Sequence, residues 1–103
     1  MRYAVLAHSG RAIAEDKAAI RANPRDPAVY RRLAGDLRGF ADDLVAVGDP
    51  PAELSSRRDR IVKHMREAAD LFDEAATALA RGDIKTFQEK GDAALRAADK
   101  AAH

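Results

Sequence analysis

The chain contains no cysteine. Disulfides, zinc sites built on thiolates and catalysis by a cysteine nucleophile are therefore excluded, although the absence of cysteine is compatible with any cell compartment. Aromatic residues make up only 5% of the 103 residues, so a hydrophobic core has few large side chains with which to fill space. No apolar run approaches the roughly 20 residues that a membrane-spanning helix needs.

The chain also lacks an excess of charge of either sign. Its 18 basic and 17 acidic residues leave a formal net charge of +1, whereas a nucleic-acid-binding domain usually carries a clear basic excess. Alanine is abundant instead, with 24 residues, and it is joined by the other strong helix formers leucine, arginine, lysine and glutamate. A chain of this length and composition predicts one helical domain with a thin core.

The N-terminal stretch MRYAVLAHSG has a single arginine and a short apolar patch, which is too weak a pattern for a secretory signal peptide. Two locations therefore stay open. The protein is cytoplasmic, or it is the mature part of an exported protein from which a leader has been removed.

The second of four helical segments has the clearest periodicity. Asp26 and Pro27 form a helix start, with an N-cap followed by a first-turn proline. Gly35 and Gly39 lie beside the apolar seam, where they either let a neighbouring helix approach closely or are merely tolerated. The seam itself advances in steps of three and four residues through Tyr30, Leu33, Leu37, Phe40, Leu44 and Val47.

The third and fourth segments meet at Gly82, which suits the left-handed position after a helix, and Asp83, which can cap the next helix. The start of the third segment has two interpretations. Either Asp49 caps a helix that begins at Pro50 or Pro51, or Ser56 caps a later one, with Asp59 three residues on. The predicted core positions are Leu54, Ile61, Met65, Ala68, Phe72, Ala75 and Leu79 in the third segment and Ile84, Phe87, Leu95, Ala98 and Ala102 in the fourth.

The first segment has a weaker pattern, with apolar residues Leu6, Ile13 and Ile20 at intervals of seven. Ser9 and Gly10 interrupt it and leave open whether the helix is continuous there. No segment alternates with period two, so we predict an all-α fold. Because short corners join antiparallel neighbours, the expected architecture is an up-down-up-down four-helix bundle in a single domain, 1–103, with helices at about 2–22, 27–47, 51–81 and 83–102.

The charges support this antiparallel order. Folding the second segment against the third about residue 49 or 50 sets Asp42 and Asp43 opposite Arg57 and Arg58. It also brings Arg31 and Arg32 near Asp70. Folding the third segment against the fourth sets Glu74 opposite Lys90. Each exposed pair contributes only about 0–1 kcal/mol, but the signs together favour this register.

The best candidate metal ligands are His64, Glu67 and Asp70, since residues three apart share one face of a helix. Di-iron bundles, however, use Glu-x-x-His motifs on two facing helices together with further carboxylates, and only one such pair occurs here, in reversed order. Asp16 is directed toward the core of the first segment without a histidine partner on its face. We therefore expect neither a metal nor a cofactor.

The densest basic run, residues 57–66, could bind phosphate groups. Asp59 interrupts the run, Asp42 and Asp43 are expected to neutralise part of it, and no aromatic residue is placed to stack bases. The hydroxyl residues Ser9, Ser55, Ser56, Thr77 and Thr86 show no placement beside a base and an orienting acid. We accordingly expect a protein that is not an enzyme and does not bind nucleic acid.

Two stretches together resemble a known type of module. DLRGFADDLVAVGDPPAEL (36–54) and RIVKHMREAADLFDEAATALARGDIKTF (60–87) combine a helix with a leucine-rich end, a proline-containing corner, a long helix and a Gly-Asp corner. The pattern, over roughly residues 26–100, is similar to small helical modules of actinobacterial exported proteins and lipoproteins. This resemblance implies an extracytoplasmic helical bundle with a binding or sensory role, and it supplies no functional residues.

Two functions stay open at this point. The thin core favours a bundle that acts through contact with another protein, including a second copy of itself. The alternative is a sensory bundle that holds a small molecule or a metal between its helices, with Tyr30, Phe40, Met65 and Phe72 as the candidate lining of the pocket.

Overall fold

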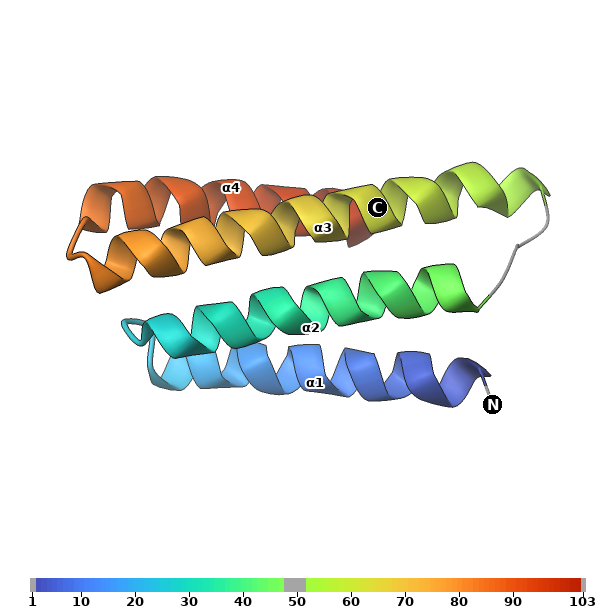
Figure 1. Cartoon of the computed structure of the whole chain (residues 1–103), viewed down its shortest axis with the longest axis horizontal. Coiled ribbons are helices and arrows are strands. Elements are labelled where there is room, and N and C mark those ends of the chain that lie inside the picture. Colours follow the sequence, from blue (N-terminus) through green and yellow to red (C-terminus); the bar gives the residue numbers. More distant parts are fainter. Residues whose placement is uncertain (1, 48–51, 103) are drawn as a thin grey trace.

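A computed structural model describes the backbone of residues 2–47 and 52–102 and the side chains of residues 8–47 and 55–101. It contains four antiparallel helices joined by short corners (Figure 1), which confirms the predicted all-α, up-down-up-down four-helix bundle. The first helix runs without interruption through Ser9 and Gly10. Each helix begins and ends within one residue of the sequence expectation: α1 is Arg2–Ala22, α2 is Pro27–Ala46, α3 is Ala52–Ala80 and α4 is Ile84–Ala102.

Local sequence explains two of the three corners. At the start of α2, the Asp26 side chain accepts a hydrogen bond of 3.0 Å from the backbone N–H of Ala28, and Pro27 occupies the first turn. After α3, Gly82 has φ = 78°, a left-handed conformation that only glycine adopts without strain. The backbone N–H of Gly82 and that of Asp83 donate to the carbonyls of Leu79 and Ala78, at 3.0 and 2.9 Å, which satisfies the end of α3.

Asp83 then starts α4, because its carboxylate accepts a hydrogen bond of 3.1 Å from the backbone N–H of Thr86. Hydrogen bonds from Thr86 hold the pKa of Asp83 below its ordinary value. The remaining corner, residues 48–51, lies outside the described residues, and so does the proposed cap at Asp49. Since α3 already begins at Ala52, the alternative start at Ser56 is wrong, and Ser56 lies inside the helix.

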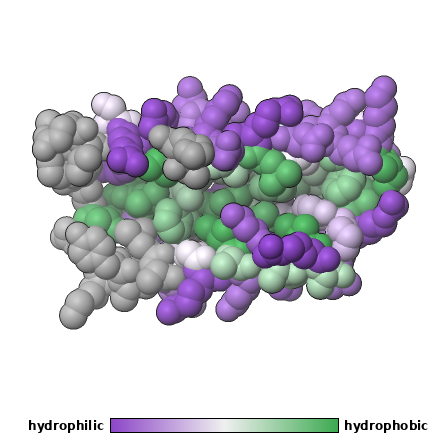
Figure 2. All heavy atoms as spheres, turned by 180° about the vertical axis from the view of Figure 1, so that it is seen from behind, coloured by the Kyte–Doolittle hydropathy of each residue, from purple (hydrophilic) through white to green (hydrophobic). Residues whose placement is uncertain are grey.

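The helices pack only on their neighbours in the chain. Among the described residues, α1 packs on α2, α2 on α3 and α3 on α4, while α1 and α4 do not approach each other. The molecule is flat as a result, with extents of 46 × 23 × 17 Å. On its broad face, hydrophobic side chains form a band along the length of the molecule between two hydrophilic margins (Figure 2). No helix in the described ranges is long and apolar enough to cross a bilayer.

The core lies between α2, α3 and α4, and it is thin because more than half of its buried hydrophobic residues are alanines. The described part of α1 contributes only half-buried side chains, among them Ile13 and Ile20. The core cluster consists of Val29, Tyr30, Leu33, Ala34, Leu37, Ala68, Ala69, Phe72, Ala76, Leu79, Ala94 and Ala97.

The predicted antiparallel pairing holds, but two of its three ion pairs have different partners. Lys90 and Glu74 pair at 3.2 Å, as predicted. Asp42 pairs with Arg66 at 3.1 Å, not with Arg57 or Arg58. Asp70 pairs with Arg38 at 2.7 Å, not with Arg31 or Arg32.

In both corrected ion pairs, the arginine that the structure shows lies later in the chain than the arginines that were predicted. Side chains on a helix lean toward its N-terminus, so a long arginine reaches a partner that faces an earlier turn than its own Cα. The first turns of α3 also extend past the end of α2 (Figure 1). Folding the sequence symmetrically about residue 49 or 50 neglects both effects.

The two glycines of α2 do not mark a close helix contact. A Cβ atom added at Gly35 or Gly39 would have nothing within 4 Å. Of the two interpretations of these glycines, simple tolerance within the helix is therefore the one that the structure supports.

Candidate functional site

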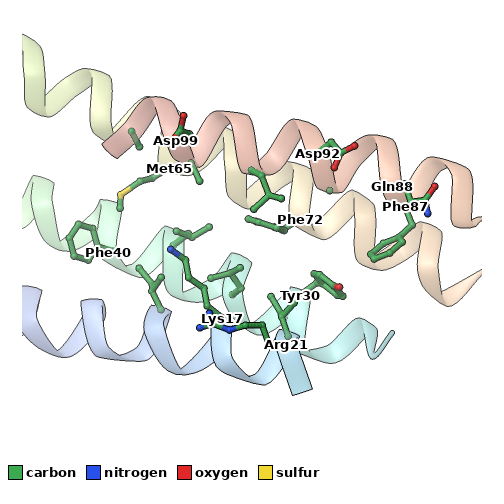
Figure 3. Close-up of a pocket in the computed structure, with 18 of the residues that line it drawn as sticks. Lys17, Arg21, Tyr30, Phe40, Met65, Phe72, Phe87, Gln88, Asp92 and Asp99 are labelled. Atoms are coloured by element: carbon green, nitrogen blue, oxygen red, sulfur yellow. The ribbon is translucent and has the colours of Figure 1, made fainter. Parts of the chain in front are cut away.

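A groove lies between α1 and α4, with α2 and α3 as its floor (Figure 3). We call it the α1/α4 groove. Its volume is about 900 Å³. The floor is apolar and is formed by Tyr30, Leu33, Leu37, Phe40, Ile61, Met65 and Phe72.

The groove exists because the apolar faces of α1 and α4 point toward each other without meeting. Ile13 and Ile20 line it on the α1 side. On the α4 side, Leu95 was expected in the core, but it is 60% exposed. Only part of the predicted stripe of α4 was right: Phe87 and Ala98 pack against the core, whereas Leu95 lies beside the groove, where no helix of the described structure covers it. The small residues Ala94 and Ala97 take the core positions of α4 instead.

One end of the groove is held in place by Tyr30. Its ring meets Phe87 of α4 edge to face, with centroids 5.3 Å apart and planes at 75°, a favoured aromatic geometry. Its hydroxyl donates a hydrogen bond of 2.5 Å to the carbonyl of Pro24, and burial raises its pKa. This end of the floor is therefore fixed by contacts to both α4 and the α1–α2 corner.

The two margins of the groove carry opposite charges. Lys17 and Arg21, one turn apart, line it on α1, and Lys17 extends over the apolar floor (Figure 3). Asp92 and Asp99, two turns apart on α4, line the opposite margin together with Gln88. An occupant therefore meets an apolar floor, a basic edge and an acidic edge.

The α1 wall is attached to α2 partly by polar contacts. The hydroxyl of Ser9 donates a hydrogen bond of 2.6 Å to a carboxylate oxygen of Asp43. Asp16 is the one buried side chain in the described part of α1, with 2% exposure, and Asp36 of α2 lies within hydrogen-bonding reach. Its Oδ2 atom is buried without a hydrogen-bond partner.

The environment of Asp16 favours its protonated form. Burial is the main cause that raises the pKa of this carboxyl to about 7, because removal from water penalises the charged form. The hydrogen bond with Asp36 and the negative charge of Asp36 raise the pKa further, while Arg32 acts in the opposite direction. A protonated Asp16 can share its proton with Asp36, and the α1–α2 contact is then free of carboxylate repulsion.

The candidate metal ligands do not come together as a site. His64 and Glu67 are neighbours, with Nδ1 3.6 Å from Oε2, but Asp70 is turned to Arg38. Within the described part of the chain, no three groups of the types that bind metals are gathered. The Nδ1 atom of His64 is buried without a hydrogen bond, and the structure offers no reason for this.

The basic run 57–66 is partly engaged in ion pairs, since Arg58 contacts Asp59 at 3.1 Å and Arg66 contacts Asp42. Two of the hydroxyl groups considered for catalysis have structural roles. Ser9 joins α1 to α2, and Thr77 donates to the backbone carbonyl of Asp73 at 3.0 Å.

The four residues predicted to line a pocket, Tyr30, Phe40, Met65 and Phe72, all lie on the floor of the α1/α4 groove. Comparison with models of protein families, with curated proteins and with solved structures gave no match. The resemblance to actinobacterial exported modules therefore stays a prediction.

Sequence reasoning did not find the charged margins or the Asp16–Asp36 contact. Lys17 and Arg21 are four residues apart and thus share one face of α1, which was a usable signal. Their position opposite Asp92 and Asp99 could not be deduced, because it depends on α1 and α4 standing apart.

Proposed function

We propose that this protein is a non-enzymatic interaction module, and that it takes up an apolar helical surface of a protein in the α1/α4 groove. The observation that carries the proposal is the uncovered apolar face of α4, with Leu95 60% exposed beside a groove of about 900 Å³. Contiguous apolar patches on a small protein commonly mark interaction sites. Docking of a helix between two others is a recurrent mode of recognition.

The shape of the groove supports a helix as the occupant. It is elongated, because it follows the helices, and the charged side chains that line it come from its two margins, with Lys17 extending over the floor. An amphipathic helix matches this pattern, with an apolar stripe facing the floor and charged residues at both flanks.

The proposal is tested by a photoreactive amino acid placed at Leu95, in cells that make the chain. The control carries the same group at Arg96, which is exposed on α4 but does not line the groove. We expect a protein adduct from position 95 alone, attached through the apolar face of a helix.

A second substitution, Gly91→Phe, should abolish this adduct. Gly91 lines the groove, and a Cβ atom added there would have nothing within 4 Å, so a side chain can be introduced at this position to occupy space in the groove. Equal adducts from positions 95 and 96, or an adduct at 95 that survives Gly91→Phe, would refute groove docking.

A second candidate function is the binding of a small apolar molecule. It is favoured by the volume of about 900 Å³, which lies within the roughly 300–1,000 Å³ typical of ligand pockets, and by the aromatic side chains of the floor. Native mass spectrometry of the purified chain separates the two functions. A stoichiometric small molecule that Gly91→Phe displaces would favour the ligand-binding function.

A further inference from the structure

We infer that the occupant of the α1/α4 groove is a second copy of this chain, docked face to face with α1 of each copy against α4 of the other. This inference rests on the proposed function and names its partner, and it places the partner's α1 and α4 along the margins of the groove rather than a single helix on its floor. It follows from the charges at the margins of the groove, from the symmetry that these charges allow and from the size of the face.

The charges make the groove complementary to itself. One margin is basic, with Lys17 and Arg21 on α1, and the other is acidic, with Asp92 and Asp99 on α4. A foreign partner would need acidic groups on one flank and basic groups on the other. A second copy already carries both sets, and complementary potentials across an interface favour docking and fix its register.

The same charges select one symmetry. If two copies face each other about a two-fold axis parallel to the helices, the basic margin of each copy meets the acidic margin of the other. A two-fold axis across the helices would instead set α1 against α1 and α4 against α4, with like charges opposed. Since homodimers are most often closed by a two-fold axis, the first arrangement is the one we infer.

In this arrangement Lys17 and Arg21 face the α4 margin of the other copy, which carries Asp92. Leu95 of each copy, which solvent surrounds in the single chain, is then covered by the opposing molecule. Burial of an apolar side chain such as leucine contributes about 1.5–3 kcal/mol relative to leaving it exposed, so the arrangement removes the most exposed large hydrophobic residue of the described structure from water.

The size of the face is sufficient for such a dimer. The groove opens on the broad side of the molecule, which measures 46 × 23 Å. A standard interface buries about 800 Å² on each partner, and a face of these dimensions can supply it. The formal net charge of +1 also means that two copies repel each other only weakly.

The test is sedimentation equilibrium of the whole chain and of charge-reversed variants over a range of concentrations. We expect the unmodified chain to dimerise. Lys17→Glu with Arg21→Glu, and separately Asp92→Lys, should each weaken dimerisation at least tenfold. An equimolar mixture of the two variants should restore a one-to-one dimer, because each reversed margin then meets its complement.

Two further variants control for folding and for net charge. Leu95→Glu, at an exposed position, should also give a folded monomer, with the helical circular dichroism of the unmodified chain. Lys63→Glu with Lys85→Glu changes the net charge as much as the α1 pair does, but at exposed residues outside the groove, and should leave the dimer intact.

A strict monomer at millimolar concentration would overturn the inference, and so would a dimer that the mixed variants fail to restore. Neither result removes the proposed docking function. A monomer that still forms the Leu95 adduct with a different protein, sensitive to Gly91→Phe, would retain groove docking and reject only the second copy as the partner.

Discussion

The two outer helices of this bundle are attached by different means. α4 packs on α3 through small buried residues, with Ala94 and Ala97 of α4 in one core cluster with Ala68, Ala69 and Ala76 of α3. α1 packs on α2 through half-buried isoleucines, a hydrogen bond from Ser9 and the buried Asp16. The comparison indicates that α3–α4 is a hydrophobic hairpin, whereas α1 is held by fewer apolar contacts and by polar groups that depend on protonation.

This difference bears directly on the groove, because α1 is one of its two walls. A wall that is attached less firmly than the rest is the part most readily displaced, since local opening takes least free energy where few apolar contacts are lost. The basic margin of the groove therefore depends on the weaker of the two attachments.

The largest effect is expected from removing a core ring. Phe72 is 4% exposed, and Phe72→Ala should lower the free energy of unfolding by about 3–5 kcal/mol. Ile13→Ala, at a half-buried position of α1, should cost about 1–2 kcal/mol, since a partly exposed side chain loses less. Urea unfolding followed by circular dichroism measures both. Equal losses would contradict the proposed difference between α1 and the core.

The next effect concerns pH. The pKa of Asp16 is about 7 in the folded chain against an ordinary value of 3.8. Between these values the unfolded chain has lost a proton that the folded chain retains, so the free energy of unfolding falls as pH rises from about 4 to about 7. The slope is at most about 1.4 kcal/mol per pH unit for one group.

Asp16→Asn removes this titration and should flatten the decline, while it keeps the size of the side chain. Glu89→Gln, at an exposed position of α4 that does not act on the pKa of Asp16, serves as the control and should leave the decline in place. Urea midpoints at pH 4.5, 6 and 7.5 test this. A decline that persists in Asp16→Asn would show that another group is responsible.

A smaller change in stability is expected from Gly→Ala substitutions, and its sign should differ between two glycines. Gly82→Ala should destabilise the chain by about 1–2 kcal/mol, because alanine is strained at φ = 78°. Gly35→Ala lies within α2 with open space around it and should stabilise the chain by about 0.4–1 kcal/mol. Thermal unfolding of the two variants should show shifts of opposite sign; the same sign in both would contradict this account of the α3–α4 corner.

Much of the fold could be predicted because it is encoded locally. Asp26 with Pro27 and Gly82 with Asp83 carry their own capping chemistry, so those helix ends followed from neighbouring residues. The apolar seams of α2 and α3 likewise predicted buried residues such as Leu33, Leu37 and Phe72. Ion-pair partners such as Asp42 and Arg66 were harder to predict from the sequence, because the pairing depends on the direction in which side chains lean and on how far α3 extends past α2.

The groove could be predicted only in part. Periodicity placed Phe40, Met65 and Phe72 on inward faces, and these residues lie on its floor. Whether another helix covers such a face depends on how all four helices are arranged, and the spacing of residues within one helix does not contain this information. Leu95 illustrates the limit, because the predicted seam of α4 placed it in the core, whereas it is 60% exposed and Ala94 and Ala97 are buried instead.

The most direct test of the central claim, that two copies of the chain dock through the α1/α4 groove, is the concentration dependence of backbone amide chemical shifts in the unmodified chain. We predict that shifts change on dimerisation at groove residues such as Ile20, Leu33 and Leu95, and that they stay constant at Lys63 and Thr77 on the outer surface. Concentration-dependent shifts confined to Lys63 and Thr77, or none at any residue up to millimolar concentration, would contradict the docking of two copies through this groove.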